Sequence, residues 1–178
     1  ADMKGLTTAQ IAAMGSLQLS TLYTDQIQGL TATQIAAIET IDLDYLATTQ
    51  VQAMLAAQLA AITTVQLQIL DSTQIRAIET VDVSSLTTNQ MAAIGSDQLA
   101  AFTTDQVAQI TTHQLSAVSA TTIDNLTSVQ VSVLTTVQLS NLGTAQIVGL
   151  GSDNIRFITT DTITGLTTVQ IGALSTNQ

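Results

Sequence analysis

The sequence repeats every eight residues, and this period constrains the fold more than any other feature. From Thr7 onward the chain divides into octads without an insertion, beginning TTAQIAAM, GSLQLSTL and YTDQIQGL and ending with TTVQIGAL and a partial STNQ. Positions five and eight of the octad are apolar throughout, position two is Thr or Ser in almost every octad, and position four is usually Gln. Such regularity is typical of a solenoid, so we expect residues 1–178 to form one solenoid domain.

A second period of forty residues lies over the first. The octads that start at 39, 79, 119 and 159 replace the glutamine at position four, and their substitutes are Asp42, Asp82, Thr122 and Thr162. The segment that starts at Asp2 falls in the same phase, and the one other exception is Asn154. Two explanations stay open. The forty-residue unit records duplication of five octads, or every fifth octad occupies a distinct place on the superhelix, for instance in one stripe.

The spacing of the apolar positions predicts the backbone. Eight residues overshoot two turns of a continuous α-helix by about 80°, so the apolar stripe of one long helix would spiral around it. Strands alternate with a period of two, whereas the apolar positions here are separated by three and then five residues. One short helix of about one and a half turns per octad satisfies the spacing of three.

The boundaries of the octads support short helices. Position one is mostly Thr, Gly, Ser or Asp, which are good N-caps, and Gln three residues later completes a capping box. We therefore predict an all-α solenoid with one helix per octad and a 40-residue superrepeat. A β-solenoid is the alternative, because Thr, Ile and Val favour strands and Thr pairs can form stacked ladders.

The composition excludes several classes of function. The chain has three basic and thirteen acidic residues, for a formal charge of −10, and lacks the positive surface that binding to nucleic acid requires. No apolar run is long enough to span a membrane, so we expect no membrane insertion. The absence of Cys removes disulfides and thiolate metal sites.

The sequence offers no candidate catalytic or cofactor-binding residue. His113 is the sole histidine and stands at position three of TTHQLSAV, where other octads carry Asp, Val, Ala or Asn. General acid or base catalysis would require a partner that the pattern does not supply. No Gly-x-Ser-x-Gly motif and no phosphate-binding glycine motif occurs. We expect that the protein is not an enzyme, and we interpret His113 as a surface residue.

The acidic residues fall into two groups. One group occupies position three, where the helix dipole favours a negative charge in the first turn; its members are Asp25, Asp97, Asp105, Asp153 and Asp161. The second group clusters in two octads and provides weak candidate ligands for Ca²⁺, although no known calcium-loop motif is present. These candidates are Glu39, Asp42, Asp44, Glu79 and Asp82.

The motif Leu-Thr-Thr-x-Gln-Ile-x-Ala-Leu occurs at Leu6–Met14, where Met closes it, and in full at Leu166–Leu174. It resembles the tandem octapeptide arrays of large secreted bacterial repeat proteins, which are often labelled haem-utilisation or adhesion exoproteins. The resemblance covers essentially the whole chain. It implies an extracellular, Gram-negative bacterial setting and an adhesive or structural role, and it transfers neither a catalytic residue nor a haem ligand.

The two ends of the array suggest how such a protein is used. The repeats begin within an octad at Ala1 and stop within another at Gln178, without the polar capping repeats that close most monomeric solenoids. We therefore expect apolar ends and head-to-tail self-association, which grows a filament because the contact does not close. Two alternatives are a segment of a large monomeric adhesin and an ice-binding solenoid that presents an array of Thr side chains.

Overall fold

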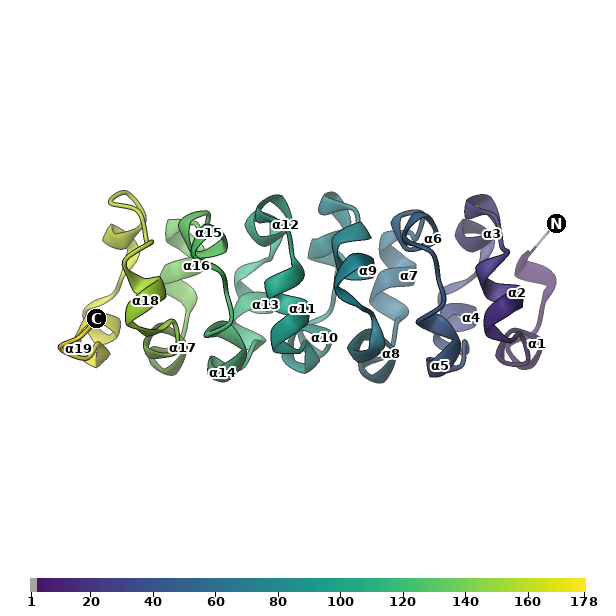
Figure 1. Cartoon of the computed structure of the whole chain (residues 1–178), viewed down its shortest axis with the longest axis horizontal. Coiled ribbons are helices and arrows are strands. Elements are labelled where there is room, and N and C mark those ends of the chain that lie inside the picture. The colour runs from purple at the N-terminus through teal and green to yellow at the C-terminus, as the bar shows by residue number, and fades with distance from the viewer. Residues whose placement is uncertain (1–2) are drawn as a thin grey trace.

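The protein is an elongated rod of short helices, with the two ends of the chain at opposite ends of the rod (Figure 1). The computed structural model describes residues 3–178, and every regular element in this part is a helix. The β-solenoid alternative is therefore wrong, and the all-α solenoid is confirmed. The elements are η1 (Met3–Gly5), α1 (Thr8–Ala12), α2 (Ser16–Ser20), α3 (Thr24–Gly29), α4 (Ala32–Ala36), α5 (Thr40–Leu43), α6 (Thr48–Gln52), α7 (Ala56–Ala61), α8 (Thr64–Ile69), α9 (Ser72–Ala77), η2 (Thr80–Ser85), α10 (Thr88–Ala93), α11 (Ser96–Ala101), α12 (Thr104–Gln109), α13 (Thr112–Ala117), α14 (Ala120–Ile123), α15 (Ser128–Ser132), α16 (Thr136–Asn141), α17 (Thr144–Gly149), α18 (Gly151–Ile155), η3 (Ile163–Gly165) and α19 (Thr168–Ala173).

Local hydrogen bonds define each helix. In α10 the cap residue Thr87 is extended, with φ −74° and ψ 158°. The Gln90 N–H donates to the Thr87 hydroxyl at 3.2 Å, and the Thr87 N–H donates to Gln90 Oε1 at 2.6 Å. The helix ends at Ala93, and Ile94 returns to an extended conformation that leads into the next cap. The chain can therefore turn after every octad.

Three octads complete one turn of the solenoid. Each helix packs on the helix three octads away, so α1 contacts α4, α2 contacts α5 and α3 contacts α6, and 24 residues form a turn. The helices therefore stack in three columns. The α1 column holds α1, α4, α7, η2, α12, α15 and α18; the α2 column holds α2, α5, α8, α10, α13, α16 and η3; the α3 column holds η1, α3, α6, α9, α11, α14, α17 and α19.

The apolar positions of all three columns form one continuous core. Position-five side chains, from Ile11 to Ile147, are at most 1% exposed, and most position-eight side chains are nearly as well buried. Each isoleucine or leucine removed from water in this way contributes about 1.5–3 kcal/mol, which compensates for the instability of isolated five- or six-residue helices. No helix among residues 3–178 is long and apolar enough to cross a membrane.

The forty-residue period does not place its members in one stripe. The octads that lack glutamine form the four-residue helices α5 and α14 and the 3-10 helices η2 and η3. Consecutive members lie in different columns, because five octads are not a whole number of three-octad turns. The interpretation that every fifth octad forms one stripe is therefore wrong. Asp2, which shares their phase, lies outside the described residues.

Candidate functional site

The side chain of Gln90 connects two turns of the solenoid. Its Oε1 accepts the N–H of Thr87 in its own octad, while its Nε2 donates to the carbonyl oxygens of Leu59 at 2.8 Å and Ile62 at 2.7 Å. These carbonyls belong to positions five and eight of the octad four places earlier. The side-chain amide of Gln90 therefore caps the start of one helix and donates hydrogen bonds to the carbonyl oxygens at the end of another.

We call the set of glutamines that bond in this way the glutamine ladder. In every member, Nε2 lies 2.6–3.3 Å from the position-five and position-eight carbonyl oxygens, and the side chain is buried. The members are Gln34, Gln50, Gln58, Gln66, Gln74, Gln90, Gln98, Gln106, Gln114, Gln130, Gln138, Gln146 and Gln170. Among the described residues, no buried side-chain N or O atom lacks a hydrogen bond.

The capping pattern in the sequence predicts only the bonds of Oε1. A signal for the second set is nevertheless present, because Glu is as good as Gln in a capping box and yet never occupies position four. A carboxylate cannot donate a hydrogen bond, whereas the amide nitrogen can. In every octad that forms a capping box this residue is Gln and never Glu, which indicates a need for a donor.

The first three glutamines of the array lack the second half of the ladder. Oε1 of Gln10, Gln18 and Gln26 accepts the N–H of its own cap residue at 2.8–3.0 Å. Among residues 3–178, no carbonyl accepts from their Nε2 atoms, because the ladder offset of four octads reaches past Met3. We call these three side chains the N-terminal end face. Their Nε2 atoms are hydrogen-bond donors at this end of the rod.

The opposite end of the rod presents the matching acceptors. The carbonyls at positions five and eight of the last three full octads accept no side-chain amide within the described chain. Their apolar side chains also lose cover, since Ile163 is 47% exposed and Ile171 is 56% exposed, although position five is buried elsewhere. We call these residues the C-terminal end face: Ile155, Ile158, Ile163, Leu166, Ile171 and Leu174.

Comparison with known protein families gives a match to two segments of the chain. The family model of the ALTTAQ repeat covers residues 1–32 and 75–112. The chain is a tandem-repeat protein. Thr-Thr-x-Gln of the ALTTAQ repeat corresponds to the cap residue and the ladder glutamine, as Thr87 and Gln90 illustrate. No curated protein matches the chain. The match supports a repeat protein and does not extend to the adhesion or haem-utilisation setting.

Most acidic residues at position three of the octads lie where the helix dipole favours them. Asp25, Asp97, Asp105 and Asp153 all fall in the first turn of a helix. Asp161 does not, because its octad lacks the ladder glutamine and forms only the 3-10 helix η3, which begins at Ile163. The prediction for Asp161 is therefore wrong.

The candidate calcium ligands remain in two separate groups. Glu39, Asp42 and Asp44 surround α5 in the α2 column, whereas Glu79 and Asp82 belong to η2 in the α1 column. In the part of the chain that the structure describes, no three His, Cys, Asp or Glu side chains lie close enough together to hold a metal ion. Calcium binding stays a prediction.

His113 lies on the outside of α13, where it is exposed. No hydrogen bond or ion pair of its imidazole occurs within residues 3–178. The Ser116 hydroxyl is close but donates to the backbone carbonyl of His113 at 3.0 Å. This arrangement agrees with the interpretation of His113 as a surface residue.

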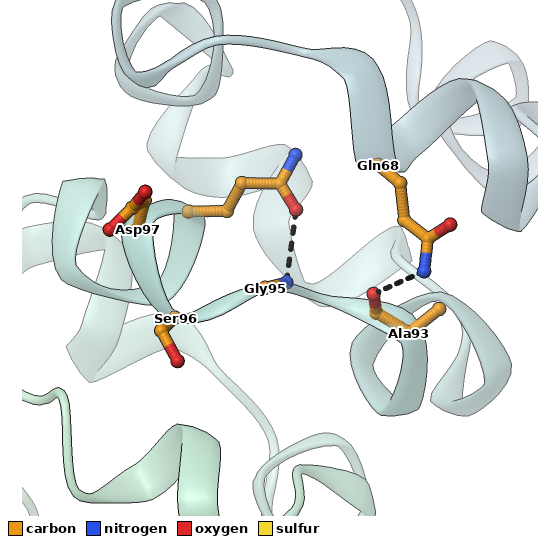
Figure 2. A pocket seen from close by; sticks show the side chains of 6 residues that line it. Gln68, Ala93, Gly95, Ser96 and Asp97 are labelled. Atoms are coloured by element: carbon orange, nitrogen blue, oxygen red, sulfur yellow. Dashed lines mark hydrogen bonds between the residues drawn. The ribbon is translucent and has the colours of Figure 1, made fainter.

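The grooves between turns are lined by the polar contacts of the repeat. In the groove between α8, α10 and α11, Gln68 Nε2 donates to the Ala93 carbonyl at 3.1 Å, and the Gly95 N–H donates to Gln98 Oε1 at 3.1 Å (Figure 2). Asp97 is the one ionisable residue among the six that line this groove. The groove therefore holds no pair of groups suited to acid and base catalysis.

Proposed function

We propose that this repeat protein is an extracellular structural element that associates head to tail into a filament, with adhesion or matrix building as its use. The observation that supports the proposal is the exposure of Ile163 and Ile171, whose position is fully buried in the interior. Covering them with the start of another array would continue the core. Further octads of a longer polypeptide would cover Ile163 and Ile171, and so would a second copy of the chain.

The two end faces differ from each other, so their contact is heterologous. A heterologous contact that does not close a ring produces an open polymer. The net charge of −10 opposes lateral aggregation of the polymers, because like-charged rods repel one another. Growth along the axis is therefore favoured.

The proposed structural role needs no catalytic residue, cofactor or nucleic acid. The extracellular bacterial setting rests on the resemblance to secreted octapeptide arrays.

Negative-stain electron microscopy of the purified protein at neutral pH tests the proposal. We expect long fibres of uniform width. Ile171→Asp should abolish them, because it places a charge on the C-terminal end face. Val169→Asp is the matched control, since Val169 lies in the same helix and is 72% exposed on the side of the rod. Dispersed short rods from the unmodified chain would overturn the proposal, as would equal loss of fibres in both variants.

Ice binding is the second candidate, and one observation favours it. Five Thr pairs, at positions one and two, stack in succession in the α2 column, at residues 63–64, 87–88, 111–112, 135–136 and 159–160. The first hydroxyl of each pair accepts the backbone N–H of the residue three places later, whereas the second makes no hydrogen bond within the described chain. Thermal hysteresis measured on the monomeric Ile171→Asp variant would support this candidate, and its absence would remove it.

A further inference from the structure

We infer that the rod binds an ordered water molecule at each place where the forty-residue period removes the ladder glutamine, and that this water takes over the hydrogen bonds of the missing amide. The inference concerns contacts in the interior of the array, so it does not depend on the proposed filament. It also assigns a physical role to the forty-residue period, which then marks the hydrated contacts between turns.

Each octad without the glutamine leaves a gap in the ladder at the octad four places earlier. In complete contacts the position-eight carbonyl accepts an amide, as Leu86 does from Gln114 at 2.6 Å. At the gaps, no hydrogen-bond donor of residues 3–178 reaches the position-eight carbonyl. We call these places the ladder gaps. Their carbonyl pairs belong to Ile11 and Met14, Val51 and Met54, Met91 and Ile94, and Val131 and Leu134.

The ladder gap beside α14 shows which groups need a partner. Met91 and Ile94 are 0% and 4% exposed. The Ile94 carbonyl accepts no hydrogen bond within the described chain, and the Met91 carbonyl accepts only the Ile94 N–H, at 3.4 Å. Across the gap, the Ser119 N–H has no acceptor among residues 3–178. Unpaired backbone groups in a protein interior are costly, so these three groups require a further partner.

These three groups surround one small space. In a complete contact a single amide reaches the cap N–H and both carbonyls, as Gln90 does. Ser119 has nearly the same backbone as the cap of such an octad, with φ −65° and ψ 151° against −74° and 158° at Thr87. Thr122 stands in place of the glutamine, and its hydroxyl accepts the Ser119 hydroxyl at 2.8 Å. Because threonine is shorter than glutamine, it ends before the space that the amide fills elsewhere.

The chemistry of the three groups identifies the ligand as water. The ligand must accept a hydrogen bond from the Ser119 N–H and donate one to each of two carbonyl oxygens. A metal cation cannot accept a hydrogen bond, and an anion cannot donate to the carbonyls. A water molecule does both, needs only about 30 Å³, and in protein interiors makes about three such bonds.

The other ladder gaps make the same demand. Asp42 and Asp82 replace the glutamine with a carboxylate, which when ionised has no proton to donate to the carbonyls. Thr162 repeats the chemistry of Thr122. Asn154, which lies outside the forty-residue phase, differs from all four because its amide still donates to the Leu126 carbonyl at 2.7 Å. The hydrated contacts therefore follow the forty-residue period.

Cross-relaxation between water and backbone amides in NMR spectra tests the inference. Water that stays bound gives an NOE and an ROE of opposite sign, and we expect this signal at the Ser119 N–H. The matched control is the Thr127 N–H, which donates to Gln130 Oε1 at 2.8 Å and lies beside a cap hydroxyl of the same kind. The Ile171→Asp variant is a suitable sample, because it leaves residues 87–126 unchanged and should not form fibres.

A second substitution in this variant completes the ladder. In Thr122→Gln, Oε1 can accept the Ser119 N–H while Nε2 donates to the Met91 and Ile94 carbonyls. We expect the bound-water signal at Ser119 to disappear and the melting temperature to rise by roughly 2–4 °C, since direct bonds replace an immobilised water. Thr121→Gln makes the same chemical change at an exposed position of the same helix, and it should alter neither quantity.

Two results would overturn the inference. One is a Ser119 N–H that shows no more bound water than the Thr127 N–H. The other is a bound-water signal that persists in a folded Thr122→Gln variant. If Thr122→Gln does not fold, Asp82→Gln provides the same comparison at the ladder gap of Val51 and Met54, with the Glu79 N–H as the observed amide. Fibre formation by the unmodified chain has no bearing on either result.

Discussion

The amide of glutamine suits position four because it accepts and donates at once. Oε1 of Gln114 accepts the N–H of Thr111 at 2.7 Å, while Nε2 donates to the carbonyls of Val83 and Leu86 at 2.9 and 2.6 Å. Helix ends bear unpaired N–H and C=O groups, and a solenoid of short helices has many such ends in its interior. One buried residue per octad solves this problem for two helices at a time.

Removal of an interior amide should therefore destabilise the protein more than removal of one at the end. Gln90→Ala leaves the Thr87 N–H and the carbonyls of Leu59 and Ile62 without their partner, and we expect a loss of about 2–4 kcal/mol in the free energy of unfolding. Gln10→Ala removes only exposed bonds, which Gln10 Oε1 accepts from the N–H and the hydroxyl of Thr7, for a loss of about 1 kcal/mol. Urea titration followed by circular dichroism measures both. Equal losses would contradict the cross-turn role of the ladder.

One cap titrates. Asp71 caps α9, and hydrogen bonds from the Thr73 hydroxyl and the Gln74 N–H lower the pKa of its carboxyl group. A lowered pKa in the folded state gives stability that is present above the unfolded value of about 3.9 and disappears as the pH falls through the folded value. Asp71→Thr retains an uncharged hydroxyl cap of the kind used at Thr63.

The stability of the unmodified chain relative to Asp71→Thr should therefore decrease between pH 5 and pH 2. The difference between their urea midpoints at the two pH values measures this effect. A difference that does not change with pH would show that the carboxylate contributes nothing as a charged cap.

At the scale of the element, the sequence predicts one short helix per octad because the cap, the capping-box glutamine and the apolar pair recur together. The departures also have visible causes. At residues 151–158, Asn154 is one carbon shorter than Gln and reaches the Leu126 carbonyl at 2.7 Å without capping the Gly151 N–H. Leu150 is then helical instead of extended, and Gly151 takes φ +71° at the start of α18. A positive φ favours glycine.

The packing of helices at position seven could not be predicted from the pattern. A Cβ on Gly149 would lie 2.7 Å from the carbonyl oxygen of Ala120, whereas a Cβ on Gly172 would meet no atom within 4 Å. We expect Gly149→Ala to destabilise the protein by about 1–3 kcal/mol, because α17 must shift away from α14. Gly172→Ala should stabilise it by up to about 1 kcal/mol through helix propensity.

Thermal unfolding of the two glycine variants provides the comparison. Both substitutions add the same methyl group to a helix. A melting temperature that falls in Gly149→Ala and rises in Gly172→Ala would therefore reflect the close contact between successive turns at Gly149. Stabilisation by Gly149→Ala would contradict the close contact between α17 and α14.

At the scale of the whole molecule, the octad pattern predicts a solenoid but not the number of octads per turn. All octads present nearly the same positions, so nothing in the sequence indicates which of them meet. The number three depends on the angle at which the extended residues of positions eight and one join successive helices. The paired end faces were only half predictable, because their apolar side chains follow from the repeat and their unpaired amides and carbonyls follow from the four-octad offset.

Because every octad offers the same donors and acceptors, removal of one complete octad should leave a shorter but intact rod. When residues 103–110 are deleted, Gln114 takes the place of Gln106 and can donate to the Ile75 and Ile78 carbonyls, which Gln106 uses in the full chain. Deletion of residues 103–106 removes half an octad and moves every later core residue out of register. We expect unchanged helicity per residue in the first variant by circular dichroism, and loss of cooperative unfolding in the second.

The size of the two deletions makes this comparison stringent. The longer deletion removes more of the buried core, including Val107 and Ile110, and would be the more harmful one if the rod depended on particular partners between octads. The shorter deletion is the more harmful one if stability depends on the repeated offset between identical units, since nearest-neighbour contacts sum along a solenoid. Greater damage from the eight-residue deletion would therefore show that the octads are not interchangeable.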